Sequence, residues 1–140
     1  MSGMGTAVSI SVKGKVTYTD NGRASEVVPV NWGGNITHTL VTSGSKTGEF
    51  KVDQDGTTVD GADNQYNPAV DVPFSWTSAH TATNLEGASE GVSTSSATPS
   101  GLPDLSTTDL AIGATFMGNI GTLSMWASEL NQDQLKGVTS

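Results

Sequence analysis

Four aspartates crowd into eleven residues and form the densest group of potential metal ligands in the chain. They are Asp53, Asp55, Asp60 and Asp63. Turns rich in carboxylate oxygen can hold calcium, which takes about six to eight oxygen ligands. The spacing lacks the terminal bidentate glutamate of an EF-hand loop, so it fails that motif. Calcium is therefore one interpretation of the cluster, and acidic turn residues in an acidic protein are the other.

Three aromatic residues offer flat faces that could stack against a sugar ring. Trp32 and Trp76 fall on the apolar parity of predicted strands, which favours core packing for both. Tyr66 lies in the turn-forming segment DNQYNP and is expected at the surface. Tyr66 and Trp76 are therefore the candidate ligand-binding residues, with a place in the core as the alternative for Trp76.

Groups able to catalyse a reaction are few. The chain has two histidines that could act as a base beside a nucleophile. His38 falls on the apolar parity of a predicted strand, which is typical of a half-buried structural histidine, whereas His80 opens a polar stretch and is expected in solvent. The sequence contains no GxSxG motif and no E-x-D-x-E pattern of the kind found in jelly-roll glycosidases. We therefore predict a protein that is not an enzyme, has no catalytic residue and binds no cofactor other than calcium.

The composition predicts that β-strands position these residues. The 140 residues suffice for one domain, 1–140, with one core. Hydrophobic residues make up 34% and charged residues 14%, a balance typical of an all-β protein with many turns. No apolar run approaches the roughly 20 residues of a membrane span, and the first five residues lack the features of a signal peptide. With no cysteine, the chain has neither disulfides nor thiolate metal sites, and we expect no association with membranes.

Charge is unevenly distributed along the chain. Residues 1–51 carry five basic and three acidic groups, whereas residues 52–140 carry eleven acidic groups and only Lys136. A cationic face cannot be assembled from this set, so nucleic-acid binding is excluded. The net charge of −8 is typical of a soluble, self-repelling surface, and a basic N-terminal sheet that docks onto an acidic neighbour is the alternative.

Period-two alternation predicts antiparallel strands through the first half of the chain. The expected ranges are 8–18, 28–32, 36–42, 49–53, 57–59 and 70–76. Gly14 falls on the apolar parity of its strand, which indicates a bulge or bend. Pro29 and Pro73 cannot donate to a ladder, which favours edge strands, or a bulge at Pro29.

Residues 77–109 are rich in Ser, Thr, Ala, Gly and Pro and carry few large apolar side chains. More than about 30 residues without a strong element are unusual inside a compact domain. We interpret this stretch as a long loop or arm that gains order by packing on a neighbouring subunit, because its apolar area is too small to pack alone.

The last quarter of the chain predicts two strands followed by a short helix. The strands are expected at 110–114 and 120–126. Asn131 can cap the helix with Gln134 as its reciprocal partner, and Leu130 and Leu135 occupy the positions of a hydrophobic staple. Gly137 suits the left-handed residue that ends a helix.

Two stretches resemble concanavalin A-like and laminin-G-like jelly-roll domains. The first contains Trp32, Ile36, Leu40, Phe50, Val52, Asp55 and Gly56. The second contains Phe116, Gly118, Ile120, Gly121, Leu123, Trp126, Leu130 and Leu135. The resemblance covers about half of the chain, and it implies an antiparallel two-sheet β-sandwich of jelly-roll type. Domains of this kind also occur in bacteriophage structural proteins, as head decorations or on fibres.

The resulting functional hypothesis is a non-catalytic structural protein of a virion. We expect a capsid decoration protein, made in the host cytoplasm, that assembles as a homo-oligomer on the major shell protein at the virion surface. Sandwich edges can be extended by a neighbour's strand, and the arm at 77–109 could order across a subunit boundary. The alternative is a lectin-like module that binds carbohydrate through a loop end, assisted by calcium.

Overall fold

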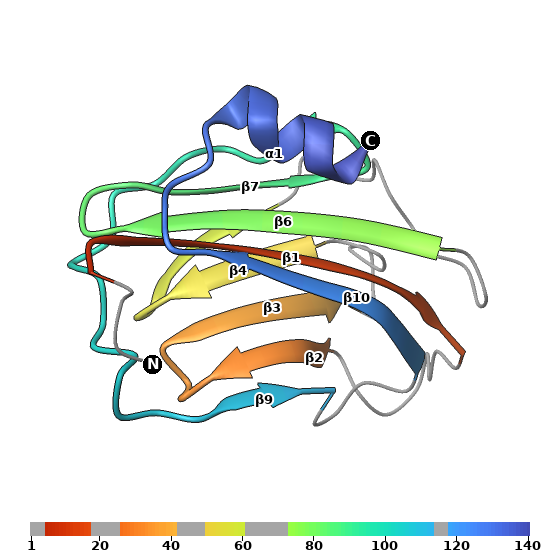
Figure 1. Cartoon of the computed structure of the whole chain (residues 1–140), viewed down its shortest axis with the longest axis horizontal. Helices are drawn as coiled ribbons and strands as arrows, with labels where there is room; N and C mark the ends of the chain where they lie inside the picture. Colours follow the sequence, from red (N-terminus) through yellow and green to blue (C-terminus); the bar gives the residue numbers. More distant parts are fainter. Residues whose placement is uncertain (1–4, 18–25, 42–49, 61–72, 114–117) are drawn as a thin grey trace.

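The computed structural model describes residues 5–17, 26–41, 50–60, 73–113 and 118–140. Within them the chain folds into two five-stranded antiparallel sheets that pack face to face, with one short helix on the outside (Figure 1). The predicted all-β sandwich with a C-terminal helix is confirmed. Among the described residues, no helix is long and apolar enough to cross a bilayer.

Sheet A joins the first strand of the chain to the last. In spatial order it contains β10 (Gly118–Trp126), β1 (Ala7–Val16), β6 (Pro73–Thr81), β7 (Leu85–Ser89) and β8 (Val92–Ser93). Sheet B contains β5 (Thr57–Asp60), β4 (Phe50–Gln54), β3 (Ile36–Val41), β2 (Glu26–Trp32) and β9 (Leu110–Ile112). The strands predicted from alternation match these elements closely, except that β6 begins and ends later than expected.

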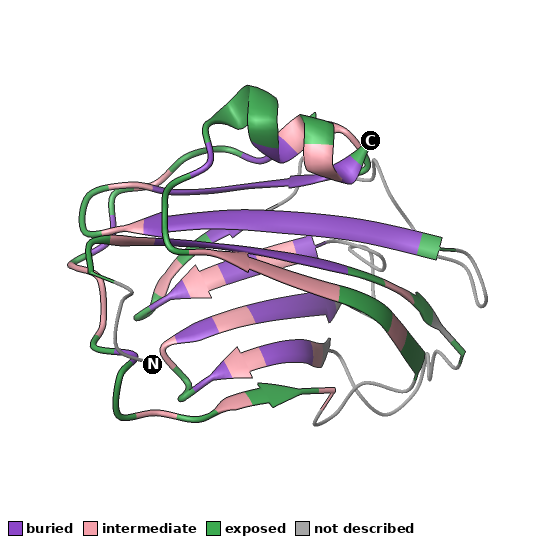
Figure 2. Cartoon of the chain, viewed as in Figure 1, coloured by how far each residue is buried: buried purple, intermediate pink, exposed green. Residues whose placement is uncertain are grey.

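The core lies between the sheets, on the parity that the sequence predicted. Val8, Ile10 and Val12 of β1 are fully buried, and Figure 2 shows buried residues, in purple, along strands of both sheets. An aromatic stack crosses the sandwich: Trp76 of β6 stacks on Phe50 of β4, with ring centroids 4.7 Å apart. This stack ties the two sheets into one hydrophobic cluster.

The prediction of a long loop or arm at 77–109 is wrong for its first part, whereas residues 94–109 contain no strand apart from an isolated bridge at Ala97. Residues 77–89 supply most of β6 and β7, which lie inside sheet A. Their small side chains are an adaptation to close packing, because Thr77, Ala79 and Ala88 lie buried on the face that the helix covers. A strand between a sheet core and a helix needs small residues on one face, so a low content of large apolar residues did not indicate a loop.

The edge positions predicted for the two prolines are also wrong. β2 lies between β3 and β9, and β6 lies between β1 and β7. Pro73 is the first residue of its strand, and Pro29 lies where the pairing of β2 with β3 shifts register. Both positions tolerate a missing N–H inside a sheet. The irregularities predicted at Pro29 and at Gly14, where β1 and β10 shift register, are confirmed.

Helix α1 (Gln132–Thr139) covers part of the outer face of sheet A. Its predicted capping box is present, with the Asn131 side chain accepting from the Gln134 amide at 3.0 Å. Leu130 and Leu135 are buried against Ala79 and Ala88. The helix does not end at Gly137, as the sequence predicted, but continues to a C-cap at Ser140.

Candidate functional site

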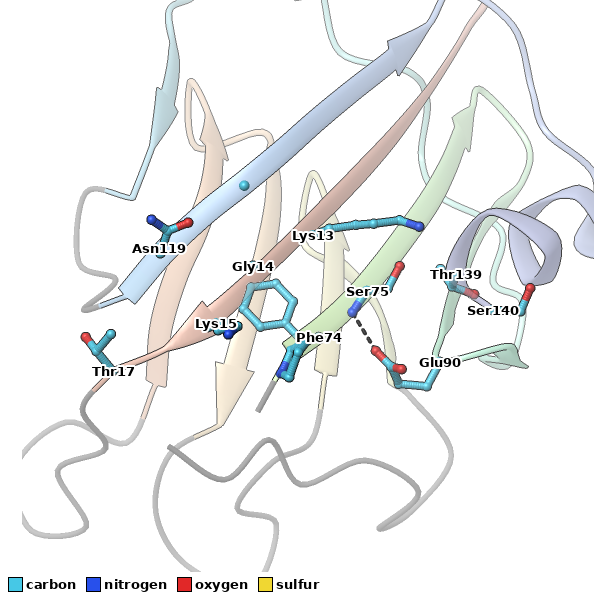
Figure 3. A pocket seen from close by; sticks show the side chains of 12 residues that line it. Lys13, Gly14, Lys15, Thr17, Phe74, Ser75, Glu90, Asn119, Thr139 and Ser140 are labelled. Atoms are coloured by element: carbon cyan, nitrogen blue, oxygen red, sulfur yellow. Dashed lines mark hydrogen bonds between the residues drawn. The ribbon is translucent and has the colours of Figure 1, made fainter. Parts of the chain in front are cut away.

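The most prominent hollow of the described surface is a groove of about 650 Å³ over the part of sheet A that α1 leaves uncovered. Two rows of outward-facing residues form its floor. One row pairs Lys13 of β1 with Thr122 of β10 and Ser75 of β6, and the next pairs Lys15 with Asn119 and Pro73. We call this hollow, lined by residues of β1, β6, β10 and the end of α1, the sheet A groove (Figure 3).

Two glycines keep the floor of the groove open. A Cβ atom on Gly14 would lie 2.4 Å from the Asn119 carbonyl oxygen and 3.0 Å from the Phe74 ring, so only glycine fits where β1 and β10 shift register. Gly121 is exposed, and a Cβ there would make only ordinary contacts, the nearest at 3.8 Å. Gly14 therefore permits the close approach of β1 and β10, and Gly121 leaves the outer side of β10 without a side chain beside the groove.

The end of α1 forms one wall of the groove. Thr139 is buried, and its hydroxyl accepts a hydrogen bond from the Gly91 amide at 3.0 Å in the turn between β7 and β8. The same hydroxyl donates to the helix carbonyl of Leu135. These bonds hold the helix end beside the turn, and Thr139 and Ser140 therefore line the groove.

The groove contains two cations and one carboxylate. Lys13 and Lys15 are exposed, and within the described part of the chain neither forms an ion pair. Glu90 accepts a hydrogen bond from the Ser75 amide at 2.5 Å, which fixes its carboxylate at the rim. Desolvation raises the pKa of Glu90, while the Ser75 bond and the Lys13 ammonium act in the opposite direction. In a chain of net charge −8, this is a local surface of positive balance.

A second, shallower hollow of about 290 Å³ lies on the outer face of sheet B. Its lining consists of Thr37, Thr39, Lys51, Asp53 and Thr58. Both carboxylate oxygens of Asp53 are engaged, because one accepts from the Gly56 amide at 3.1 Å and the other from the Thr58 hydroxyl at 2.9 Å. This hollow is smaller than the sheet A groove and its carboxylate is committed to the β4–β5 turn, so we do not take it as the ligand site.

The two histidines lie together in the core and line neither hollow. Both are fully buried, which corrects the expectation that His80 is in solvent and the half-buried position expected for His38. Their Nε2 atoms lie 2.6 and 2.8 Å from the hydroxyl of Ser78. Although the arrangement joins serine to histidine, the groups have no access to a substrate, so they cannot act on one.

The structure separates the aromatic candidates. Trp76 is fully buried and stacks between Phe74 and Phe50, so it has no surface to offer a ligand and occupies the core position that its parity favoured. Tyr66 lies outside the described residues. Trp32, also predicted for the core, is 1% exposed.

The aspartate cluster is only partly described. Asp53 holds the β4–β5 turn, and Asp55 adopts a positive φ of 49° and accepts from the Ser100 hydroxyl at 3.3 Å. Asp63 and the side chain of Asp60 lie outside the description. The described residues contain no group of three or more His, Asp or Glu side chains that could hold a metal ion. The calcium site therefore stays a prediction.

Sequence reasoning did not select the residues of the sheet A groove. Lys13 and Lys15 share the parity opposite to Val8, Ile10 and Val12, which placed them on an outer face, and they belong to the basic N-terminal sheet noted above. Their neighbours Asn119 and Thr139 come from the other end of the chain. No local pattern links positions more than a hundred residues apart.

The chain was also compared with known proteins. No family model matches it, and a search of the curated proteins finds no match. Solved structures do match. The CBM40 domain of the Ruminococcus gnavus IT-sialidase, bound to α2,3-sialyllactose, aligns with a TM-score of 0.70 and 16% identity, over 96% of this chain and 83% of that one.

Two further structures extend the comparison. Domain 4 of AbnA, a GH43 extracellular arabinanase from Geobacillus stearothermophilus in complex with arabinotriose, aligns with a TM-score of 0.68 and 15% identity, over 99% of this chain and 69% of that one. The native heptameric SAP-like pentraxin from Limulus polyphemus aligns with a TM-score of 0.62 and 9% identity, over 96% and 71% of the two chains. At these identities the likeness establishes the β-sandwich fold of the chain, and nothing beyond the fold.

Proposed function

We propose that this chain is a non-catalytic carbohydrate-binding domain and that the sheet A groove is its binding surface. The observation that carries the proposal is an open groove, with polar and charged side chains in its lining, on a sandwich whose structural neighbours include two domains solved with an oligosaccharide bound. Fold alone does not assign function, so the proposal depends on what this groove offers a sugar.

The groove suits the hydrogen-bonding chemistry of a sugar. Sugar hydroxyls both donate and accept, and the groove presents amide, hydroxyl and ammonium groups around a floor with little side-chain bulk. The side chains of Asn119, Lys13 and Lys15 form no hydrogen bond within the described part of the chain, so they are available to a ligand. The volume of about 650 Å³ lies in the range of small-molecule sites, which is roughly 300 to 1,000 Å³.

A binding function agrees better with the structure than the virion-shell function predicted from the sequence. That prediction relied on an arm at 77–109, and the first part of this segment instead builds the end of β6, β7 and β8. Homo-oligomer formation and a shell-protein partner stay predictions. Catalysis has little basis in the groove, because its single carboxylate, Glu90, has no second acid beside it among the described lining residues and both histidines are buried.

The test is a glycan array followed by calorimetric titration of the best ligand. Gly121→Trp fills the groove without meeting backbone, whereas Gly101→Trp adds the same bulk at a glycine that has nothing within 4 Å of an added Cβ and lies outside the groove. We expect Gly121→Trp to abolish binding and Gly101→Trp to retain it. If Gly121→Trp still binds the ligand, the binding site lies outside the groove. If no glycan on the array binds, the proposed function is refuted.

The same titration tests calcium. Asp53 and Asp55 lie at the β4–β5 turn of sheet B, whereas the groove is lined by sheet A and the end of α1. We therefore propose that any calcium at the cluster acts on stability and leaves sugar affinity unchanged. Titrations in calcium and in a chelator should give the same Kd, and a loss of affinity in the chelator would restore the calcium-assisted lectin predicted from the sequence.

A further inference from the structure

We infer that the sheet A groove selects an acidic glycan, one that carries negative charges on at least two of its sugar units. The inference rests on the proposed function and specifies its ligand class. It is carried by the placement of two cations, since Lys13 and Lys15 are two of only six basic residues in the whole chain and both line this groove.

The two lysines form separate contact points. They lie two residues apart on one strand and face the same side, which sets their backbones about 7 Å apart. Figure 3 shows that their side chains point in different directions, with Lys13 extending towards the end of α1, where Thr139 and Ser140 lie. In this arrangement the two ammonium groups diverge, which suits an extended chain with repeated negative charges better than a single small anion.

The remaining charge in the groove is Glu90, and its position explains how an anion is tolerated. The carboxylate accepts from the Ser75 amide at 2.5 Å, so part of its charge is neutralised by the backbone. Lys13 lies close enough to influence its pKa. Among the described lining side chains, two positive charges thus stand against one partly compensated negative charge. At physiological salt, the repulsion from the acidic groups elsewhere on the molecule is screened beyond about 8 Å.

The experiment compares ligands that differ only in charge. An oligogalacturonate and its methyl ester share their sugars and linkages, and a sulfated galactan oligosaccharide carries sulfate esters in place of carboxylates. Calorimetric titration at physiological salt should show binding of the oligogalacturonate at least tenfold tighter than binding of its ester. If the sulfated ligand binds as tightly as the oligogalacturonate, the groove selects charge alone. If it does not, the groove selects carboxylates.

Charge-neutralising variants locate the effect. Lys13→Gln and Lys15→Gln should each weaken oligogalacturonate binding about 2- to 5-fold, and Glu90→Gln should strengthen it by a similar factor, as expected for exposed charge pairs. Lys136→Gln, whose ammonium pairs with Asp133 on α1, makes the same charge change outside the groove and should have no effect. All four positions are accessible to solvent, so the substitutions leave the core intact.

Each outcome separates the inference from the proposed function. Equal binding of the acid and its ester overturns the inference and leaves carbohydrate binding standing. The groove is not the acidic site if binding of the acid is unchanged in Lys13→Gln and Lys15→Gln but is weakened in Lys51→Gln on sheet B. Failure of every acidic and neutral oligosaccharide to bind overturns both.

Discussion

At the scale of single residues, a chain of hydrogen bonds in the core fixes the protonation of both histidines. The Nε2 group of Gln54 donates to the carbonyls of Thr81 and Gly101, at 2.7 and 2.8 Å, so its Oε1 accepts from His80 Nδ1 at 3.0 Å. His80 Nε2 must then accept from the Ser78 hydroxyl, which in turn accepts from His38 Nε2. Each histidine is thus neutral, with one defined tautomer.

This network makes the protein sensitive to acid. Burial lowers the pKa of His38 to about 3, and burial together with the charge of His38 lowers that of His80 to about 3. The unfolded chain binds protons at these residues below pH 6.5 and the folded chain does not, so stability falls as the pH drops from 6.5 towards 3. Each histidine contributes a slope of up to about 1.4 kcal/mol per pH unit in that window.

Denaturant titrations at pH 7, 6, 5 and 4 measure this slope. The double variant His38→Gln/His80→Gln is expected to be less stable at pH 7 but to have a flatter dependence between pH 6.5 and 4. The raised pKa of Glu86, caused mainly by desolvation, acts in the opposite direction and is present in both proteins. An unchanged slope in the double variant would mean that other groups cause the acid sensitivity.

The network also shows where residue-level prediction fails. The apolar parity around His38 predicted its side of the sheet, and the structure places it there with a greater degree of burial. His80 has no large apolar neighbours at alternate positions, because Ser78 and Ala82 flank it on the same parity. Its burial comes from pairing with β1 and β7 and from Gln54 of the other sheet. Such contacts between distant segments leave no local pattern.

At the scale of elements, the sequence predicted most strands but not what lies on top of them. Alternation located β1 to β5 and the first part of β6, and short apolar runs located β9 and β10. β6 and β7 are covered on both faces, by sheet B and by α1, and their small outward residues obscured the alternation. The groove escaped prediction for the same reason, since it is the part of sheet A that α1 leaves open.

Helix α1 offers two substitutions with opposite expected effects. Leu135→Ala removes a fully buried side chain from the contact with Ala79 and Ala88 and should lower the free energy of unfolding by about 2 to 5 kcal/mol. Gly137→Ala adds a methyl group in open space within the helix and should raise it by about 0.5 to 1 kcal/mol. Thermal and urea unfolding of both variants give these values. Destabilisation by Gly137→Ala would favour the helix end that the sequence predicted at this residue.

At the scale of the whole molecule, the chain alternates between the two sheets, so neither sheet is continuous in sequence. Sheet A takes β1, then β6 to β8, then β10, and sheet B takes the strands between. Because the strands interleave, each sheet depends on the other for its core face, and the single domain 1–140 stays a prediction. The sequence could establish the class of fold from strand number and spacing, while the pairing order, and with it the groove, depends on contacts between the two ends of the chain.

The aromatic stack between the sheets provides a test of this unity. Phe50 of sheet B lies between His38, at 5.4 Å, and Trp76 of sheet A, at 4.7 Å. Phe50→Leu removes stacking and volume at the centre of the sandwich and should destabilise the protein by about 1 to 3 kcal/mol. Since both sheets share this core, tryptophan fluorescence and far-ultraviolet circular dichroism should report one coincident transition in the wild type and in the variant, shifted equally. Thr58→Ala changes an exposed residue on the outer face of sheet B and serves as the control, for which we expect only a small shift of the unfolding transition. Two separate transitions would mean that the sheets unfold independently and that the chain is not one cooperative domain.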